Sequence, residues 1–107
     1  MASWAEVVAA GAGLPGVEEG TWYGTAALTV RGKGFCRLRD EGETLVVPVV
    51  ELEDKETLLR SDPEVFFTIP HYDGHAFVLV RLARVSEETL RELIEDAWRC
   101  RAPESLQ

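Results

Sequence analysis

The chain has 107 residues, of which 46% are hydrophobic and 28% charged, and its formal net charge at pH 7 is −8. This length predicts one domain over residues 1–107, with enough buried surface for a core that needs neither a metal nor a disulfide. The acidic balance disfavours a general attraction to polyanions, and no apolar run in the sequence approaches the length of a membrane span.

The two cysteines, Cys36 and Cys100, lie far apart in the sequence and form no paired motif. This usage suits a reducing compartment and gives no disulfide framework. The mildly apolar segment 2–14 has no basic start and is interrupted by Glu6, so it does not resemble a signal peptide. We therefore expect a cytoplasmic protein with no membrane partner.

The first predicted element is a helix over residues 4–12. Ser3 and Glu6 have the spacing of a capping box, and apolar residues follow at helical intervals. Glycine and proline residues end this helix, and residues 14–20 are interpreted as a linking turn.

Two strands are predicted next, over residues 22–31 and 35–39, joined by a three-residue loop at positions 32–34. This loop sets Val30 opposite Cys36, whereas a two-residue loop would mix apolar and polar side chains on each face, so the longer loop is favoured. The apolar face then holds Ala26, Leu28, Val30, Cys36 and Leu38. The other face holds Thr29, Arg31, Phe35, Arg37 and Arg39.

A third strand is predicted over residues 44–50. Pro48 cannot donate a backbone hydrogen bond to a neighbouring strand, which places this strand at an edge of the sheet. A short helix follows over residues 54–60 and ends at Asp62, because the residue before a proline avoids the helical region.

The last part of the chain predicts strands over residues 65–69 and 76–82, with a turn between them, and then a helix capped by Ser86. The apolar stripe of that helix consists of Leu90, Leu93, Ile94, Ala97 and Trp98. The element order α-β-β-β-α-β-β-α predicts an α+β fold in two layers, a five-stranded antiparallel sheet with helices on one face.

Residues 31–39 contain four basic residues and no acidic one, whereas residues 40–64 contain nine acidic and two basic residues. A sheet face that combines arginines for phosphates with aromatics for stacking is typical of single-stranded nucleic-acid binding. The candidate residues are Arg31, Lys33, Phe35, Arg37, Arg39 and Arg81. The alternative is a solvated face whose arginines pair with nearby acids such as Glu41 and Glu43.

Both histidines lie in the predicted turn, in the pattern His71-x-Asp73-x-His75. Imidazole and carboxylate side chains at this spacing can hold a divalent metal. No third histidine or cysteine is near in the sequence, and Asp73-Gly74 is a favoured hairpin dipeptide. We therefore favour a structural turn and expect no metal and no cofactor.

Motifs spread over almost the whole chain also carry a resemblance. They are Leu14-Pro15-Gly16-Val17-Glu18-Glu19, Tyr23-Gly24-Thr25, Lys33-Gly34-Phe35-Cys36-Arg37-Leu38, Asp62-Pro63-Glu64-Val65-Phe66-Phe67, His71-Tyr72-Asp73-Gly74-His75, Val78-Leu79-Val80-Arg81-Leu82, Ala97-Trp98 and Ala102-Pro103. As a set and in this order they resemble the MmcQ/YjbR family of small bacterial proteins. The resemblance implies that family's α+β sandwich, which is likened to a double-wing DNA-binding architecture, and it implies no catalytic residues.

These observations predict a monomeric binding module without enzymatic activity, whose basic sheet face binds DNA or another nucleic acid. The DNA-binding label of the family rests on fold analogy. One alternative is a protein–protein adaptor that uses the same face, because arginine and aromatic residues are enriched in interfaces. A further alternative is a metal or enzyme site at His71, Asp73 and His75.

Overall fold

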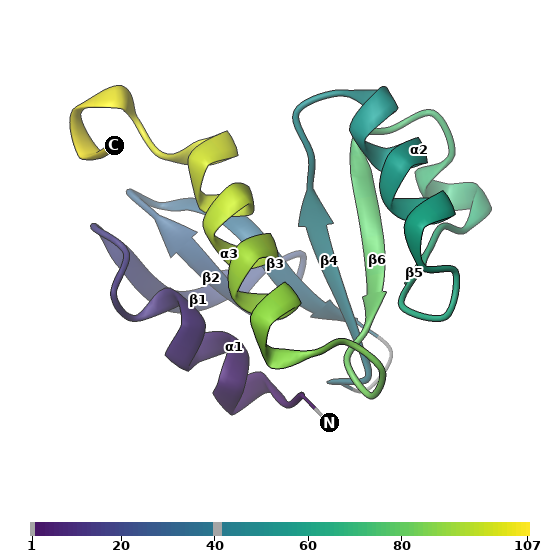
Figure 1. Cartoon of the computed structure of the whole chain (residues 1–107). Helices are drawn as coiled ribbons and strands as arrows, with labels where there is room; N and C mark the ends of the chain where they lie inside the picture. The colour runs from purple at the N-terminus through teal and green to yellow at the C-terminus, as the bar shows by residue number, and fades with distance from the viewer. Residues whose placement is uncertain (1, 40–41) are drawn as a thin grey trace.

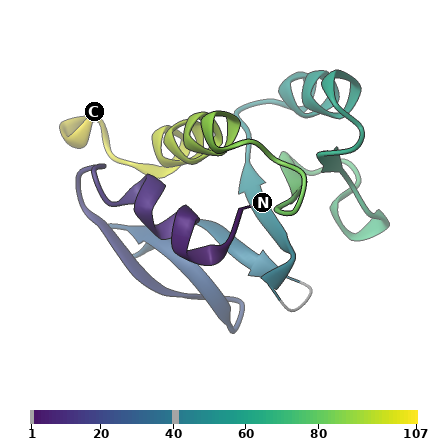
Figure 2. The same ribbon diagram turned by 60° about the horizontal axis from the view of Figure 1, so that its bottom comes forward.

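The structure, a computed structural model, describes residues 2–39 and 42–107. Within these residues, three α-helices and one six-stranded sheet form an α+β fold (Figure 1). All strand pairs are antiparallel, and the strands lie in the spatial order β1-β2-β3-β4-β6-β5. The helices lie on the same side of the sheet (Figure 2). The α+β class and the helical layer are as predicted, but the sheet has one strand more than the sequence suggested.

The elements have the following bounds. The helices are α1 (Trp4–Gly11), α2 (Leu52–Ser61) and α3 (Glu87–Arg101). The strands are β1 (Val17–Trp22), β2 (Thr25–Val30), β3 (Lys33–Arg39), β4 (Thr44–Pro48), β5 (Phe66–Phe67) and β6 (Phe77–Arg81). Short 3-10 helices cover Pro70–Tyr72 and Glu104–Leu106.

Local signals placed the first and last α-helices correctly. The hydroxyl of Ser86 accepts a hydrogen bond from the Thr89 amide at 3.1 Å, and that of Ser3 accepts one from Glu6 at 3.4 Å. These contacts satisfy amides that a helix leaves without partners at its start. All five residues of the predicted α3 stripe are buried.

Strand β1 is the element that the sequence did not reveal, because residues 14–20 were interpreted as a linking turn. Its four central residues are exposed, so the strand shows no apolar alternation. Backbone pairing with β2 holds it in place, from Val17 opposite Val30 to Trp22 opposite Thr25. The strand predicted over residues 22–31 is therefore split by a turn at Tyr23 and Gly24.

The predicted three-residue loop between β2 and β3 is also wrong. The loop has two residues, Arg31 and Gly32, with φ of 52° and 81°, as a type I′ turn requires. Val30 lies opposite Lys33, and the register then shifts so that Leu28 lies opposite Cys36. This bulge restores Leu28, Val30, Cys36 and Leu38 to the core side, where burial of one face demands them.

The bulge has a second consequence, for Phe35. The sequence predicted Phe35 on the polar face with the arginines. In the structure it is fully buried and belongs to the main core together with Cys36. The extra residue in β3 turns two successive side chains inward, which strict alternation would not allow. Phe35 therefore leaves the candidate binding face.

Strand β4 is central rather than at an edge, since it pairs with β3 on one side and with β6 on the other. The Val49 amide donates to the Ala76 carbonyl at 2.9 Å, toward β6. The Pro48 nitrogen therefore faces the β3 side, where pairing stops at Val46. A proline at this end costs no ladder hydrogen bond, so it is tolerated within a central strand.

The main core lies between the sheet and the helices. Its sheet residues include Leu28, Cys36, Leu45, Val47, Val78 and Val80, all nearly or fully buried. Helices α1 and α3 cover β2, β3 and β4, and Leu58 and Leu59 of α2 pack on the same cluster. The opposite sheet face carries no α-helix among the described residues and is the open face described below.

Candidate functional site

The open face of the sheet carries a second apolar cluster. Val46 and Leu79 lie opposite each other in β4 and β6, and Arg37 lies opposite Val46 in β3, so these three side chains share one face. A cavity of about 460 Å³ opens over them, within the range of small-molecule sites. Its lining residues are Trp22, Tyr23, Arg37, Val46, His71, Tyr72 and Phe77. We call it the open-face cavity.

The first wall of the open-face cavity is the turn between β1 and β2. Tyr23 and Gly24 have φ of 55° and 77°, which fits a type I′ turn. Tyr23 is 78% exposed, and its ring stacks on Trp22 at 5.4 Å between centroids. The indole of Trp22 in turn lies on Gly34, where an added Cβ would come within 2.5 Å of the ring.

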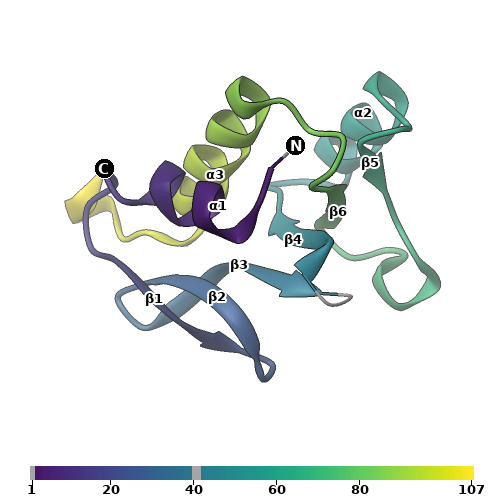
Figure 3. The same cartoon turned by 90° about the horizontal axis from the view of Figure 1, so that it is seen from below.

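The second wall is the 70–75 turn between β5 and β6. The rings of His71 and Tyr72 meet edge to face at 4.9 Å, and Tyr72 lies 5.8 Å from Phe77. Figure 3 shows that this turn and the tip of the β1–β2 hairpin both extend on the side of the sheet away from α1 and α3. The two walls and the strands between them therefore form a concave, ring-lined surface.

Lys55 of α2 fixes the second wall. Its ammonium group is buried and donates hydrogen bonds to the carbonyl oxygens of Tyr72 at 2.6 Å and His75 at 3.1 Å. Burial lowers the pKa of Lys55, and the nearby charge of Asp73 opposes that shift. A buried ammonium with two carbonyl partners holds the backbone of the turn in one position.

Arg37 is the charged group of the open-face cavity, and it is half-buried. Its guanidinium donates to the Tyr72 hydroxyl at 2.6 Å and to the Thr25 hydroxyl and the Leu38 carbonyl at 3.4 Å each. It also lies over the Tyr23 ring, at 5.3 Å from the centroid. These partners are all neutral, so the contacts orient the guanidinium without neutralising its charge.

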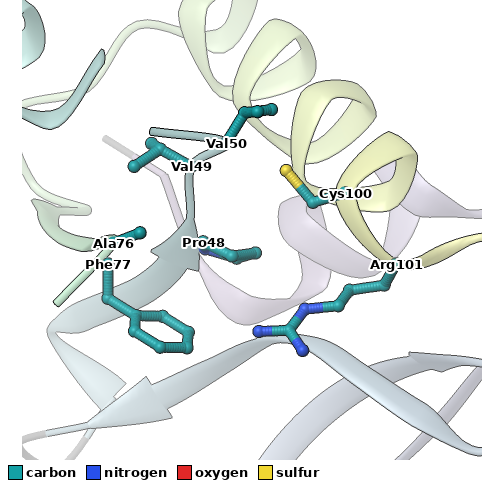
Figure 4. A pocket seen from close by; sticks show the side chains of 7 residues that line it. All are labelled: Pro48, Val49, Val50, Ala76, Phe77, Cys100 and Arg101. Carbon is teal, nitrogen blue, oxygen red and sulfur yellow. The ribbon is translucent and has the colours of Figure 1, made fainter. Parts of the chain in front are cut away.

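A second arginine approaches the same aromatic cluster from the helical layer. Arg101, at the end of α3, points across a smaller pocket of about 250 Å³ toward Phe77 (Figure 4). Its guanidinium carbon lies 5.7 Å from the ring centroids of both Trp22 and Phe77. Trp22 and Phe77 are themselves 6.1 Å apart, so the rings of one cluster contact Arg101 at Trp22 and Phe77 and Arg37 at Tyr23.

The structure separates the residues of the predicted basic face. Arg39 lies over the Tyr72 ring at 5.8 Å, next to the cavity. Arg81 stacks on Phe67 at 4.1 Å and donates to the carbonyls of Pro63 and Glu64, outside the cavity lining. Arg31 in the β2–β3 turn and Lys33 at the start of β3 are exposed at the other end of β2. The face thus brings together Arg37 and Arg39 and leaves the other basic candidates apart.

Ion pairs seen among the described residues lie on the exposed surface of α3. Arg91 pairs with Glu87 at 2.9 Å, and Arg99 pairs with Glu95 at 2.7 Å. The predicted alternative, in which the arginines of the open face pair with nearby acids, involves Glu41, which lies outside the described residues. For Arg37, the hydrogen-bond partners found in residues 2–39 and 42–107 include no carboxylate.

The predicted metal-site alternative involves both histidines and Asp73, which all lie in the 70–75 turn. His71, Asp73 and His75 are all exposed in the same turn, and only His71 of the three lines the open-face cavity. In the described part of the chain, no three side chains of His, Cys, Asp or Glu converge in a way that would hold a metal ion. Gly74, with φ of 77°, supports the interpretation of Asp73-Gly74 as a structural turn.

Neither cysteine shows the properties of a nucleophile. Cys36 is fully buried, and this burial raises the pKa of its thiol to about 12. Burial also raises the pKa of Cys100, although the Arg101 charge opposes the shift. A reactive cysteine needs a lowered pKa, so Cys36 behaves as the buried hydrophobe that its place on the apolar face indicates.

The site residues that were not identified from the sequence include Tyr23, Tyr72, Lys55 and Arg101. Tyr23 had one usable signal, because a Tyr-Gly dipeptide at a two-residue turn exposes its aromatic ring. The other three reach the site from a turn, from α2 and from the end of α3. Only the tertiary arrangement brings them to one face.

The chain is similar in sequence to known proteins. A family model described as YjbR matches residues 12–100. Uncharacterized proteins of Mycobacterium bovis and Mycobacterium tuberculosis are each 43% identical to this chain over 65 residues. The matched segment covers 61% of this chain, and the chain spans about half the length (50%) of these relatives.

A solved structure supports the fold independently. The crystal structure of the Deinococcus radiodurans protein DR2400, whose domain is described as DUF419, superposes with a TM-score of 0.74 and 20% sequence identity. The superposition covers 92% of this chain and 77% of that protein. Within the described residues, no helix is both long enough and apolar enough to cross a bilayer.

Proposed function

The chain belongs to the YjbR family, and we propose that its open sheet face binds nucleic acid, with bases on the aromatic rings and phosphates at Arg37 and Arg39. Bases stack on aromatic side chains with little sequence preference, and arginines bind the phosphates between them. The face offers both groups within one concave surface.

The observation that carries this proposal is the environment of Arg37. Its guanidinium is half-buried among rings, and its hydrogen-bond partners are two hydroxyls and a backbone carbonyl. A cation that is partly removed from water and has only neutral partners favours an anionic ligand. The rings around it are suited to the base that accompanies a phosphate.

A protein partner is the second candidate, supported by Tyr23. This side chain is 78% exposed at the tip of a hairpin, and exposed tyrosines beside arginines are enriched in protein interfaces. The net charge of −8 would also suit a basic protein better than a polyanion. The experiment below separates the two candidates.

The test is a fluorescence-anisotropy titration of labelled single-stranded and double-stranded DNA at low and moderate ionic strength. We expect salt-sensitive binding of the single strand that weakens about ten-fold or more in Arg37→Met. Arg91→Met is the matched control, because it removes the same charge from the exposed surface of α3. Absence of binding at low ionic strength, where attraction is strongest, would reject the proposal and favour the protein partner.

A further inference from the structure

We propose that the open-face cavity holds a single nucleotide unit, with its base between the β1–β2 turn and the 70–75 turn and its phosphate at Arg37. This inference rests on the proposed function and makes it more specific. The shared chemistry is a planar base that carries a phosphate, supplied either by a free nucleotide or by an unpaired position in a strand.

The shape of the cavity supports one base rather than a run of bases. A cavity of about 460 Å³ closed by two turns differs from a flat sheet, on which successive bases would stack side by side. Tyr23 and Trp22 form one wall, and Tyr72 and His71 form the other. Val46, which is 1% exposed, lies beneath them as an apolar floor. A planar apolar group with polar edges matches this lining.

The side chain of Tyr23 supports a ligand in this cavity. Its φ of 55° belongs to a type I′ turn, where Asn or Gly is the usual first residue and a bulky side chain is strained. The protein places an aromatic residue there and leaves 78% of it exposed. Strain of this kind is typical of ligand clamps. The ring contacts Trp22 and Arg37 within the protein, and most of the residue still faces solvent at the mouth of the cavity.

The charges of the protein limit the length of the ligand. Arg37 and Arg101 flank the ring cluster, while the whole chain carries a net charge of −8. This net charge would repel the parts of a long polyanion that extend beyond the cavity. A duplex would also have to unpair and unstack a base before that base could enter between the walls. Short, unpaired ligands therefore fit best.

The experiment titrates the whole chain, labelled with ¹⁵N, with thymidine monophosphate, thymidine, inorganic phosphate, oligothymidylates of increasing length and a DNA duplex. We expect thymidine monophosphate to shift the amide signals of residues around the cavity more than thymidine or phosphate does. Affinity should rise over the first few nucleotides and then level off, and the duplex should bind more weakly than the single strand. Affinity that stays at the mononucleotide level for every length would identify the free nucleotide as the ligand.

The matched variants are Tyr23→Asn and Tyr23→Phe. Tyr23→Asn removes the ring but suits the type I′ turn, so we expect at least ten-fold weaker binding with a melting temperature near that of the wild type. Tyr23→Phe keeps the ring and should keep the binding. Arg31→Asn, the same change in the turn between β2 and β3, measures how much Asn alone alters the melting temperature.

The outcomes separate this inference from the proposed function. If long single strands bind while thymidine monophosphate leaves the cavity signals unchanged and Tyr23→Asn binds normally, the nucleotide cavity is rejected and nucleic-acid binding stands. If no oligonucleotide and no nucleotide binds, both are rejected. If Tyr23→Asn unfolds, the shift pattern of the wild type and the retained binding of Tyr23→Phe decide the question.

Discussion

Gly34 lies directly beneath the indole of Trp22 and so determines where one wall of the open-face cavity stands. A Cβ at this position would come within 2.5 Å of the ring, which no side chain tolerates without movement. Trp22 contacts both Tyr23 and Phe77. A methyl group on Gly34 would therefore displace the aromatic cluster as a whole.

We expect Gly34→Ala to lower the free energy of unfolding by roughly 1–3 kcal/mol, the usual cost of forcing extra volume into a packed site. Ligand binding at the open face should weaken as well. The measurement is urea denaturation followed by tryptophan fluorescence. Gly13→Ala is the control, since an added Cβ there meets nothing within 4 Å. Equal stability of the two variants would contradict the close approach of Trp22 to Gly34.

Cys36 gives a prediction for pH dependence. Burial raises the pKa of its thiol from 9.0 to about 12, so between these values the unfolded state loses a proton that the folded state keeps. The contribution of Cys36 to stability is therefore fully present below pH 9 and is lost as the pH rises toward 12. The loss approaches about 1.4 kcal/mol per pH unit.

The variant Cys36→Ala isolates this contribution. Its small cavity shifts the stability by a constant amount, but it removes the titration. The wild type should therefore lose stability relative to the variant as the pH is raised from 8 to about 10.5, within the range in which the thiol titrates. Urea denaturation at several pH values measures this difference. A difference that does not change with pH would mean that the folded protein ionises Cys36 as readily as the unfolded chain does.

At the scale of elements, α2 and the 70–75 turn act as one unit through Lys55. Lys55 is the one fully buried side chain of α2, and Leu58 and Leu59 are half-buried against the core. The ammonium group bridges two carbonyls of the turn, and the turn presents His71 and Tyr72 to the cavity. The position of the second wall therefore depends on a side chain from a distant segment.

We expect Lys55→Met to lower the free energy of unfolding by about 1–3 kcal/mol, because it leaves the carbonyls of Tyr72 and His75 without these donors. Hydrogen exchange should become faster in residues 72–77, and binding at the open face should weaken. Lys33→Met, which alters an exposed lysine, is the control for stability. Unchanged exchange in the turn would show that Lys55 does not hold it.

At the scale of the whole molecule, the helical layer and the open face carry different arrangements of charge. The exposed surface of α3 carries ion pairs and further acids, and α2 begins with Glu53 and Asp54 in its first turn. The open face carries Arg37 and Arg39, with Arg101 at its border. On the proposed function, an anionic ligand would meet only these few cations at the open face.

The small number of cations predicts a shallow salt dependence. For single strands, the logarithm of the binding constant falls with the logarithm of salt concentration by about 0.7 per phosphate neutralised. With two or three phosphates in contact, we expect a slope of about −2, and Arg37→Met should reduce its magnitude by about 0.7. Anisotropy titrations at several salt concentrations measure the slope. A slope steeper than about −4 would require a longer basic track than this face provides.

Much of the fold was predictable because its signals are local. Ser86 and the stripe from Leu90 to Trp98 specify α3 through capping and periodicity within one segment. The apolar strand β6 and the division of Leu28 and Cys36 from Arg37 follow in the same way from alternation along a strand. The sequence also placed Arg37 and Arg39 on one face, but it added Arg31, which lies in a turn, and Phe35, which is buried.

Other features were decided by neighbours that are distant in the sequence. Strand β1 exists because β2 pairs with it, and the bulge that buries Phe35 reconciles a two-residue turn with the core. Pro48 lies in a central strand because pairing with β3 ends at Val46.

The sequence by itself therefore determined the helices, the apolar face of the sheet and the positive charge of arginines on its other face. The tertiary structure alone decided the open-face cavity, where Lys55 bonds across 17 residues to Tyr72, and Arg101 reaches Trp22 from the end of α3. The physical reason is that helix caps and apolar periodicity act within one segment of the chain. A cavity forms where separate segments come together, and strand order and register determine which segments do so.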